Sequence, residues 1–168
     1  MVEQTGNIWN HWRDGLPIVI PTNLGWRSNG SNVMGAGLAK QAAAHAPLLP
    51  VHYGAVCQRY AEGYPQQDRH FVYYFATERL IMAASKPLNV MAPHLSWQGR
   101  ASYDTVHGSL VELRDLCSVV KCFALPLLGT GNGGLDATTV LGMTRRVLGD
   151  TDAILMVPDS VLDKRGCT

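Results

Sequence analysis

The sequence predicts a single domain of the α/β class, and three observations carry that prediction. Segments typical of strands and of helices alternate along the chain, as they do where helices cover a largely parallel sheet. The 168 residues are enough for one domain, and 46% of them are hydrophobic, which suffices for a buried core. No internal repeat, low-complexity run or linker divides the chain. We therefore expect residues 1–168 to form one domain.

Short apolar runs predict five strands. They lie at residues 16–23, 71–75, 80–84, 122–128 and 153–157. Four helices are expected as well, at residues 38–46, 51–60, 103–120 and 136–148. The third of these has apolar side chains three or four positions apart, which form one helical stripe. The fourth has Asp136 at its N-cap, a position that aspartate favours.

Composition argues against several classes of protein. Charged residues make up 16% of the chain and the net charge is +1, unlike a protein that grips duplex nucleic acid or anionic lipid. No apolar stretch approaches the roughly 18 residues of a membrane span, and the N-terminus lacks the apolar core of a signal peptide. The four cysteines show no framework spacing and no Cys-x-x-Cys. We therefore expect reduced thiols, a cytoplasmic location, and neither a metal nor a cofactor.

A glycine-rich segment follows the strand predicted at residues 122–128. This second loop, residues 129–136, reads Gly-Thr-Gly-Asn-Gly-Gly-Leu-Asp. Glycine permits positive φ angles and lets backbone N–H groups approach a ligand closely, so the loop suits a phosphate group. The other interpretation is a tight turn from strand to helix, for which glycine is an entropically costly choice.

The second loop also matches the Gly-x-Gly-x-x-Gly pattern of dinucleotide-binding Rossmann domains, with Asp159 as a candidate ribose ligand. That pattern normally opens the nucleotide-binding half of the fold, whereas a single predicted strand follows it here. The phosphate-binding pattern of Walker-type ATPases does not occur. We therefore favour neither class.

A first loop, residues 23–37, follows the strand predicted at residues 16–23. Asn23 offers a donor and an acceptor to a sugar hydroxyl, although asparagine also forms plain turns. Gly35 and Gly37 lie where the next helix begins, and helix N-termini attract anions. Ligands of α/β folds bind beyond the carboxyl ends of strands. The two loops together therefore suit a diphosphate with a sugar on either side.

Five segments, in order, resemble the macrodomain family, in the branch of the terminal ADP-ribose glycohydrolases and the DNA ADP-ribosyl glycohydrolase antitoxins. They are Gly-Asn-Ile at 6–8, Ile-Val-Ile-Pro-Thr-Asn at 18–23, Val-Met-Gly-Ala-Gly-Leu-Ala at 33–39, Leu-Ile-Met-Ala-Ala-Ser-Lys at 80–86, and Leu-Gly-Thr-Gly-Asn-Gly-Gly-Leu-Asp at 128–136. The resemblance covers most of the chain. It implies a three-layer α/β/α fold with a central mixed sheet, and binding of ADP-ribose.

The resemblance also implies a set of ligand-binding residues. They are Asn7, Ile8, Asn23, Met34, Gly35, Ala36, Gly37, Leu38, Gly129, Thr130, Gly131, Asn132, Gly133, Gly134 and Leu135. Asn7 stands where the family has an aspartate that reads the adenine amino group. Its side-chain oxygen can still accept a hydrogen bond from that group, but the amide adds a donor and removes a charge.

In the same branch a lysine is the nucleophile and an aspartate assists it, which implies Lys86 and Asp136 in this chain. A neutral lysine amine can attack the opened sugar at C1″ and form a Schiff base, while a carboxylate moves the proton. A second alignment puts Glu78 at the lysine position and would remove this chemistry. We prefer Lys86, because residues 80–84 supply the apolar strand before it.

Three functions follow from this resemblance and stay open. The first is a hydrolase that releases ADP-ribose from a DNA base or a protein acidic side chain. The second is a reader that binds ADP-ribose without turnover, and the third is an enzyme acting on a small nucleotide such as ADP-ribose 1″-phosphate. In each case the partner is ADP-ribose or an ADP-ribosylated molecule, and we expect the protein to act as a monomer.

Overall fold

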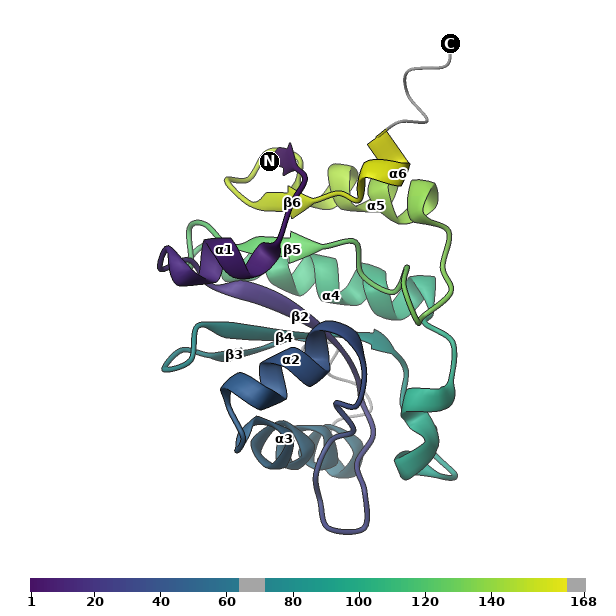
Figure 1. Ribbon diagram of the computed structural model, residues 1–168. Coiled ribbons are helices and arrows are strands. Elements are labelled where there is room, and N and C mark those ends of the chain that lie inside the picture. The colour runs from purple at the N-terminus through teal and green to yellow at the C-terminus, as the bar shows by residue number, and fades with distance from the viewer. Residues whose placement is uncertain (64–71, 163–168) are drawn as a thin grey trace.

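The computed structural model describes residues 1–63 and 72–162, which form a six-stranded mixed sheet between helices (Figure 1). The strands are β1 (Val2–Gln4), β2 (Ile18–Asn23), β3 (Val72–Phe75), β4 (Leu80–Lys86), β5 (Ala124–Pro126) and β6 (Ile154–Met156). Their order across the sheet is β1-β6-β5-β2-β4-β3. Strand β3 is antiparallel to β4, and the other described pairs are parallel.

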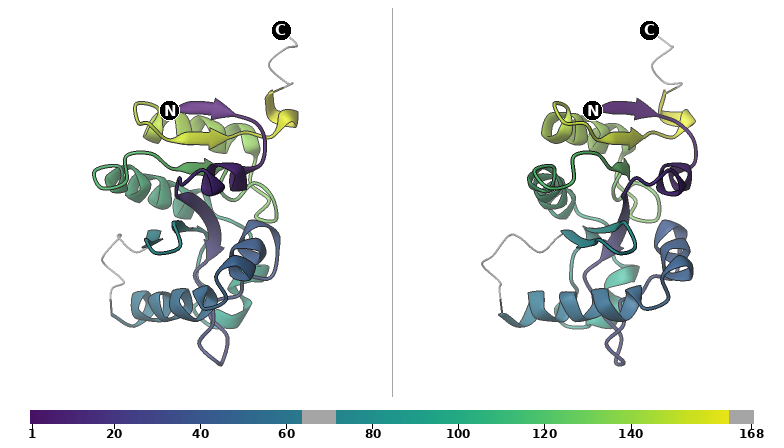
Figure 2. Two further views of the ribbon diagram at one scale, coloured as in Figure 1. Left: turned by 60° about the vertical axis from the view of Figure 1, so that its left-hand side comes forward. Right: turned by 90° about the vertical axis from the view of Figure 1, so that its left-hand side faces the viewer.

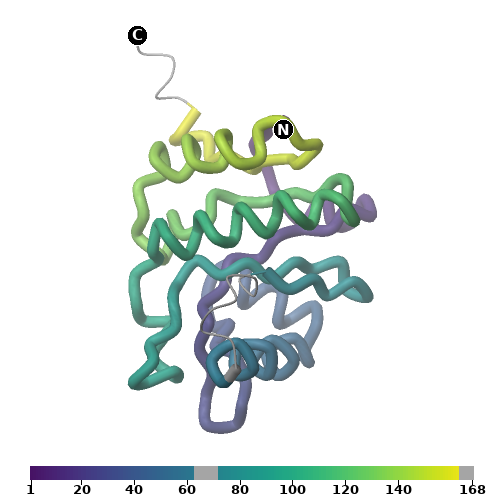
Figure 3. The backbone as a smooth tube through the Cα atoms, turned by 180° about the vertical axis from the view of Figure 1, so that it is seen from behind, coloured from purple at the N-terminus to yellow at the C-terminus, as the bar shows by residue number. Residues whose placement is uncertain are grey.

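The two faces of the sheet carry separate cores, because successive side chains of a strand point to opposite faces. In β2, Ile18 and Ile20 join a core with α1 (Ile8–Arg13), α2 (Gly37–His45) and α3 (Leu49–Gly63). Val19 joins the other core, with α4 (Tyr103–Leu116) and α5 (Ala137–Leu148). Figure 2 shows α1 and α2 on one side of the sheet, and Figure 3 shows α4 and α5 covering the other. The predicted three-layer α/β/α architecture is confirmed.

Several element ends differ from the sequence-based expectation. The helix expected to reach residue 120 ends at Leu116, and the strand expected at residues 122–128 is reduced to Ala124–Pro126. Elements β1 and α1 were not predicted, nor were the 3₁₀ helix η1 (Pro93–Gln98) and α6 (Asp159–Leu162). Residue 71, at the start of the second predicted strand, lies outside the described residues.

The structure also describes the cysteines, the groups that could bind a metal, and the lengths of the helices. Cys57, Cys117 and Cys122 are free thiols, while Cys167 lies outside the described residues. Within residues 1–63 and 72–162, no group of three or more His, Cys, Asp or Glu side chains is placed to hold a metal ion. No helix in those ranges has the length and apolar character to cross a membrane.

The register of the sheet decides which polar residues share an edge. Strands β2 and β4 are parallel, and Asn23 lies opposite Lys86 at their carboxyl ends. The first loop follows β2, and the second loop follows β5, which is parallel to β2, so both loops leave the sheet at this edge. Strand β6 runs the same way as β5. Glu78 lies in the turn between β3 and β4, at the amino end of β4. It is therefore Lys86, and not Glu78, that lies beside the two loops.

Candidate ligand-binding site

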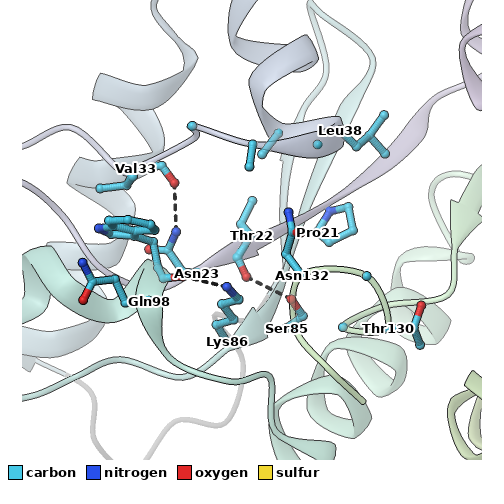
Figure 4. A pocket seen from close by; sticks show the side chains of 18 of the residues that line it. Pro21, Thr22, Asn23, Val33, Leu38, Ser85, Lys86, Gln98, Thr130 and Asn132 are labelled. Carbon is cyan, nitrogen blue, oxygen red and sulfur yellow. Dashed lines mark hydrogen bonds between the residues drawn. The ribbon is translucent and has the colours of Figure 1, made fainter. Parts of the chain in front are cut away.

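A pocket of about 1630 Å³ opens at the carboxyl edge of the sheet (Figure 4). Its walls come from the ends of β2, β4, β5 and β6, from both loops, from the first turn of α2 and from η1. The predicted site residues in its lining are Asn23, Gly35, Ala36, Gly37, Leu38, Lys86, Gly129, Thr130, Gly131, Asn132 and Gly133. The fold thus brings the two predicted loops and Lys86 around one cavity.

The second loop is shaped by its own backbone and by the segment after η1. Leu135 N donates to Gly129 O at 3.0 Å, and Ala101 N donates to Gly133 O at 3.0 Å. A Cβ on Gly133 would lie 2.4 Å from Gly129 O and 2.7 Å from Ala101 Cβ, so only glycine fits there. A Cβ on Gly131, in contrast, would meet nothing within 4 Å. Packing therefore requires glycine at 133, whereas glycine at 131 leaves space in the pocket.

Helix α2 opens into the pocket without a side-chain cap. Its N-cap residue is Ala36, whose extended backbone carries no capping side chain. The first N–H groups of a helix have no partner within the helix, and the positive end of its dipole favours anions. Because Ala36, Gly37 and Leu38 line the pocket, an anionic ligand at this wall would meet that terminus.

Asn23, at the end of β2, has most of its hydrogen-bonding capacity occupied. Its Oδ1 accepts from Gly25 N at 3.0 Å and from Asn32 Nδ2 at 3.2 Å. Its Nδ2 donates to Val33 O at 2.9 Å. An amide oxygen has two lone pairs and an amide nitrogen has two N–H groups, so one N–H remains for a ligand. The expected role as both donor and acceptor is therefore reduced to that of a donor.

Lys86 ends β4 and reaches into the pocket beside Asn23 (Figure 4). Its Nζ donates to Trp97 O of η1 at 2.6 Å. Desolvation by the pocket walls lowers the pKa of the Lys86 amine, because burial disfavours the charged form. The neutral amine, which is the nucleophilic form, is thus more readily formed here than in a solvated lysine.

Asp136 is the N-cap of α5, as the sequence predicted, and it lies outside the pocket lining. Its Oδ2 accepts from Thr139 N at 2.9 Å and from Thr139 Oγ1 at 2.7 Å. Its backbone N donates to Tyr103 Oη at 3.2 Å. In this arrangement the carboxylate stabilises the start of α5, and a proton-transfer role would require it to turn toward the pocket.

The structure leaves five further predicted ligand residues outside the lining. They are Asn7, Ile8, Met34, Gly134 and Leu135. Asn7 caps α1, and its Oδ1 accepts from Trp9 N at 3.0 Å, so the oxygen expected to read adenine is used by the helix. Ile8 and Met34 are buried in the core beneath α1 and α2. The structure therefore does not bring the Asn7 oxygen to the pocket.

The lining is positively charged. Arg27 and Lys86 both contribute to it, whereas no aspartate or glutamate does so in the part of the chain that the structure describes. Unlike charges attract most strongly in a cavity with low-dielectric walls. This cavity is therefore suited to a ligand that carries negative charge.

Sequence reasoning did not single out the wall formed after β6. Met156 and Pro158 line the pocket. They lie at the carboxyl end of β6, which is parallel to β5 and therefore ends at the same edge of the sheet. No glycine loop or polar motif marks this segment in the sequence. The strand order was the missing information, since parallel neighbours end at the same edge.

Several solved structures share the fold that surrounds this pocket. The chain is similar to the macrodomain of Mycobacterium tuberculosis DarG, at 22% identity over 94% of this chain and 95% of that chain, with a TM-score of 0.66. It is similar to the macrodomain of Thermus aquaticus DarG, at 26% identity over 94% and 97%, with a TM-score of 0.63. Thermosipho africanus DarTG, solved in complex with ADP-ribose, matches at 17% identity over 92% of this chain and 40% of that chain, with a TM-score of 0.67.

No protein-family model matches the sequence, and the search of curated proteins found no match. The structural matches extend over nearly the whole described chain and include the layered sheet that surrounds the pocket. The fold is that of a macrodomain. The likeness to both DarG macrodomains supports a position in the DarG-like branch of that fold.

Proposed function

We propose that the chain binds ADP-ribose in this pocket and releases it by hydrolysis from an ADP-ribosylated macromolecule, with Lys86 as the nucleophile. The observation that carries the proposal is the position of Lys86. Its partly desolvated amine lies at the end of β4, beside Asn23 and between the two loops. The solved DarTG complex supports ADP-ribose as the ligand class of this fold.

The binding half of the proposal rests on the charge and size of the pocket. The open start of α2 and the N–H groups of the second loop would hold the diphosphate, with Arg27 adding positive charge. A volume of about 1630 Å³ exceeds the roughly 300–1,000 Å³ common for small-molecule pockets. The cavity therefore has room for ADP-ribose and for part of the attached acceptor.

All of these groups belong to one chain, which is compatible with action as a monomer, and we propose the cytoplasm as its location.

The chemical half begins when the distal ribose opens. A proton reaches the ring oxygen O4″ as the C1″–O4″ bond breaks, and the neutral Lys86 amine forms an N–C1″ bond. The acceptor leaves with the lysine proton, which gives an imine between Lys86 and C1″. Water then adds to the imine, the C1″–N bond breaks, and the ring closes to give free ADP-ribose and the restored amine. The net reaction consumes one water and returns the unmodified acceptor.

Asp136 is the proposed proton carrier for O4″ and the leaving group. Its position outside the lining is the observation that favours the second candidate function, a reader that binds ADP-ribose without turnover. The variant Asp136→Asn separates the two roles of Asp136, proton carrier and helix cap, because asparagine caps helices as well as aspartate does. If Asp136 carries the proton, this variant loses at least about tenfold in turnover, the low end for acid–base catalysis. Unchanged turnover would leave Asp136 as a cap alone.

The decisive experiment for the nucleophile compares Lys86→Ala with Lys40→Ala. Lys40 is an exposed lysine of α2 that does not line the pocket. We expect Lys86→Ala to abolish release of ADP-ribose while its affinity for ADP-ribose stays within a few-fold of wild type, because a nucleophile acts mainly in the transition state. Lys40→Ala should retain full activity. Borohydride added during turnover should trap ADP-ribose on Lys86.

The acceptor is identified by supplying one set of substrates with different linkages. DNA carrying ADP-ribose on a base, protein carrying it on an acidic side chain, and ADP-ribose 1″-phosphate are incubated separately with wild type and with Lys86→Ala. A substrate from which the wild type releases ADP-ribose, and Lys86→Ala does not, identifies the class of acceptor. Wild type that binds ADP-ribose but releases it from none of them would identify a reader.

A further inference from the structure

Asn32 is an asparagine of the first loop that lies behind the pocket wall. Only 2% of its surface is exposed, and it does not line the pocket. Its Nδ2 lies 2.8 Å from Gly25 O, 2.9 Å from Asn23 O and 3.2 Å from Asn23 Oδ1. Because all three neighbours are acceptors, only the NH₂ end of the amide fits among them. The surroundings therefore fix which way round the Asn32 amide lies.

The other end of this amide is unsatisfied. Asn32 Oδ1 is buried and has no hydrogen-bond partner among the described residues. A buried acceptor without a partner destabilises a folded protein, and such groups in native structures call for an explanation. Packing alone does not require an amide whose oxygen is unpaired, which points to a role in the contacts that Asn32 makes with Asn23.

We propose that Asn32 is a positioning residue that, together with Gly25 N and Val33 O, fixes the orientation of the Asn23 amide and thereby contributes to the preference of the site for ADP-ribose over ADP. The inference rests on the proposed binding function. Asn32 Nδ2 shares its two N–H groups among three oxygens, one of which is Asn23 Oδ1 at 3.2 Å, and Gly25 N donates to the same Oδ1 at 3.0 Å. If the Asn23 amide were reversed, its NH₂ group would face these two donors and both bonds would be lost.

The fixed orientation has a consequence for ligand recognition. With its oxygen held by Asn32 and Gly25, Asn23 offers one remaining N–H, and this residue lines the pocket next to Lys86. It can bind a ligand hydroxyl only through the oxygen of that hydroxyl. The distal ribose of ADP-ribose carries such hydroxyls, whereas ADP lacks this sugar and shares the diphosphate contacts.

Calorimetry with ADP-ribose and with ADP tests this role on wild type, Asn32→Ala and the matched control Asn29→Ala. Asn29 belongs to the same loop, is exposed, and accepts from Ser31 N at 3.0 Å. We expect Asn32→Ala to reduce the preference for ADP-ribose over ADP about tenfold, as for one misdirected hydrogen bond, and Asn29→Ala to leave it unchanged. A purely structural role would weaken both ligands alike, and an unchanged preference in Asn32→Ala would overturn the proposal.

A double-mutant cycle tests whether Asn32 acts through Asn23. In the Asn23→Ala background, Asn32→Ala should cause no further loss of preference, because the group it positions is gone. A second, independent loss would overturn the proposal. If Asn32→Ala does not fold, Asn32→Leu, which has a similar size and no donor, is judged by the same criteria. Wild type that binds ADP-ribose no tighter than ADP would refute the proposed function, whereas a preference that survives in Asn32→Ala refutes the role of Asn32 alone.

Discussion

The first and second loops line the same pocket, yet different interactions give them their shapes. In the second loop the backbone packs so tightly that a Cβ on Gly133 would overlap Gly129 O, and the helix that follows is capped by Asp136. In the first loop the side-chain amide of Asn32 holds the turn together, and the helix that follows has no capping side chain among the described residues. The shape of the second loop therefore depends on a glycine that has no side chain, and the shape of the first loop depends on a buried side-chain amide.

The difference bears on how each loop would bind an anion. The carboxylate of Asp136 already occupies the start of α5, where it accepts from Thr139 N, so we expect a ligand to meet the N–H groups of the second loop that precede Asp136. The start of α2 is not satisfied in this way and faces the pocket, so its first turn is available to a phosphate. The two glycine-containing loops thus present different parts of the backbone.

The largest effect expected from this comparison is on stability. Gly133→Ala should lower the free energy of unfolding by about 2–3 kcal/mol, because the new Cβ would lie 2.4 Å from a backbone oxygen. Gly35→Ala in the first loop is the control, since its Cβ would approach Val33 Cγ1 no closer than 4.0 Å. It should change stability by less than about 0.5 kcal/mol. Equal losses in denaturant unfolding would remove the distinction between the loops.

The next effect is on binding and not on stability. Gly131→Val places a side chain where nothing lies within 4 Å, in a position that lines the pocket. Affinity for ADP-ribose should fall at least tenfold, or about 1.4 kcal/mol, while the melting temperature stays near that of wild type. Unchanged affinity in calorimetry would show that the ligand does not approach the second loop.

A smaller effect separates the capped helix from the uncapped one. Asp136→Ala should lower the free energy of unfolding by about 1 kcal/mol, because the bonds from Thr139 N and Oγ1 are lost. Asp136→Asn should retain most of that stability. Thermal unfolding of the two variants side by side checks the cap, and equal melting temperatures would show that it contributes little.

The smallest effect has opposite signs for stability and for binding. Ala36→Asp introduces a capping carboxylate at the start of α2 and should raise the free energy of unfolding by about 0.5 kcal/mol. The same carboxylate would occupy the terminus proposed for phosphate, so ADP-ribose should bind more weakly. Tighter binding by this variant would contradict the assignment of α2 as an anion site.

Some of this architecture was predictable from the sequence because its signals are strong and local. The apolar run of β4, the helical stripe of α4 and the N-cap of α5 were all predicted near their observed positions. Strand β1 has three residues and α1 has six, and both are too short for a periodic pattern. The interaction of Asn32 with Asn23 was not predictable, because an asparagine in a loop rich in glycine and serine is typical of any turn.

The sequence favoured Lys86 over Glu78 because an apolar strand precedes it, but it did not show where the two residues lie in the sheet. Both follow apolar runs in the sequence, and only the antiparallel turn between β3 and β4 shows that they lie at opposite ends of β4. The positions of Asn7 and Asp136 outside the lining were likewise invisible in the sequence, since a ligand contact and a helix cap call for the same residue types.

The central claim is that the two loops together hold the diphosphate and the distal ribose of ADP-ribose, and calorimetry of the wild-type protein tests it most directly. Titrations with ADP-ribose and with AMP compare a ligand that spans both loops with one that lacks the second phosphate and the distal ribose. The account predicts that ADP-ribose binds at least about a hundredfold more tightly, because these groups add contacts worth several hydrogen bonds. Equal affinities for the two ligands would contradict it.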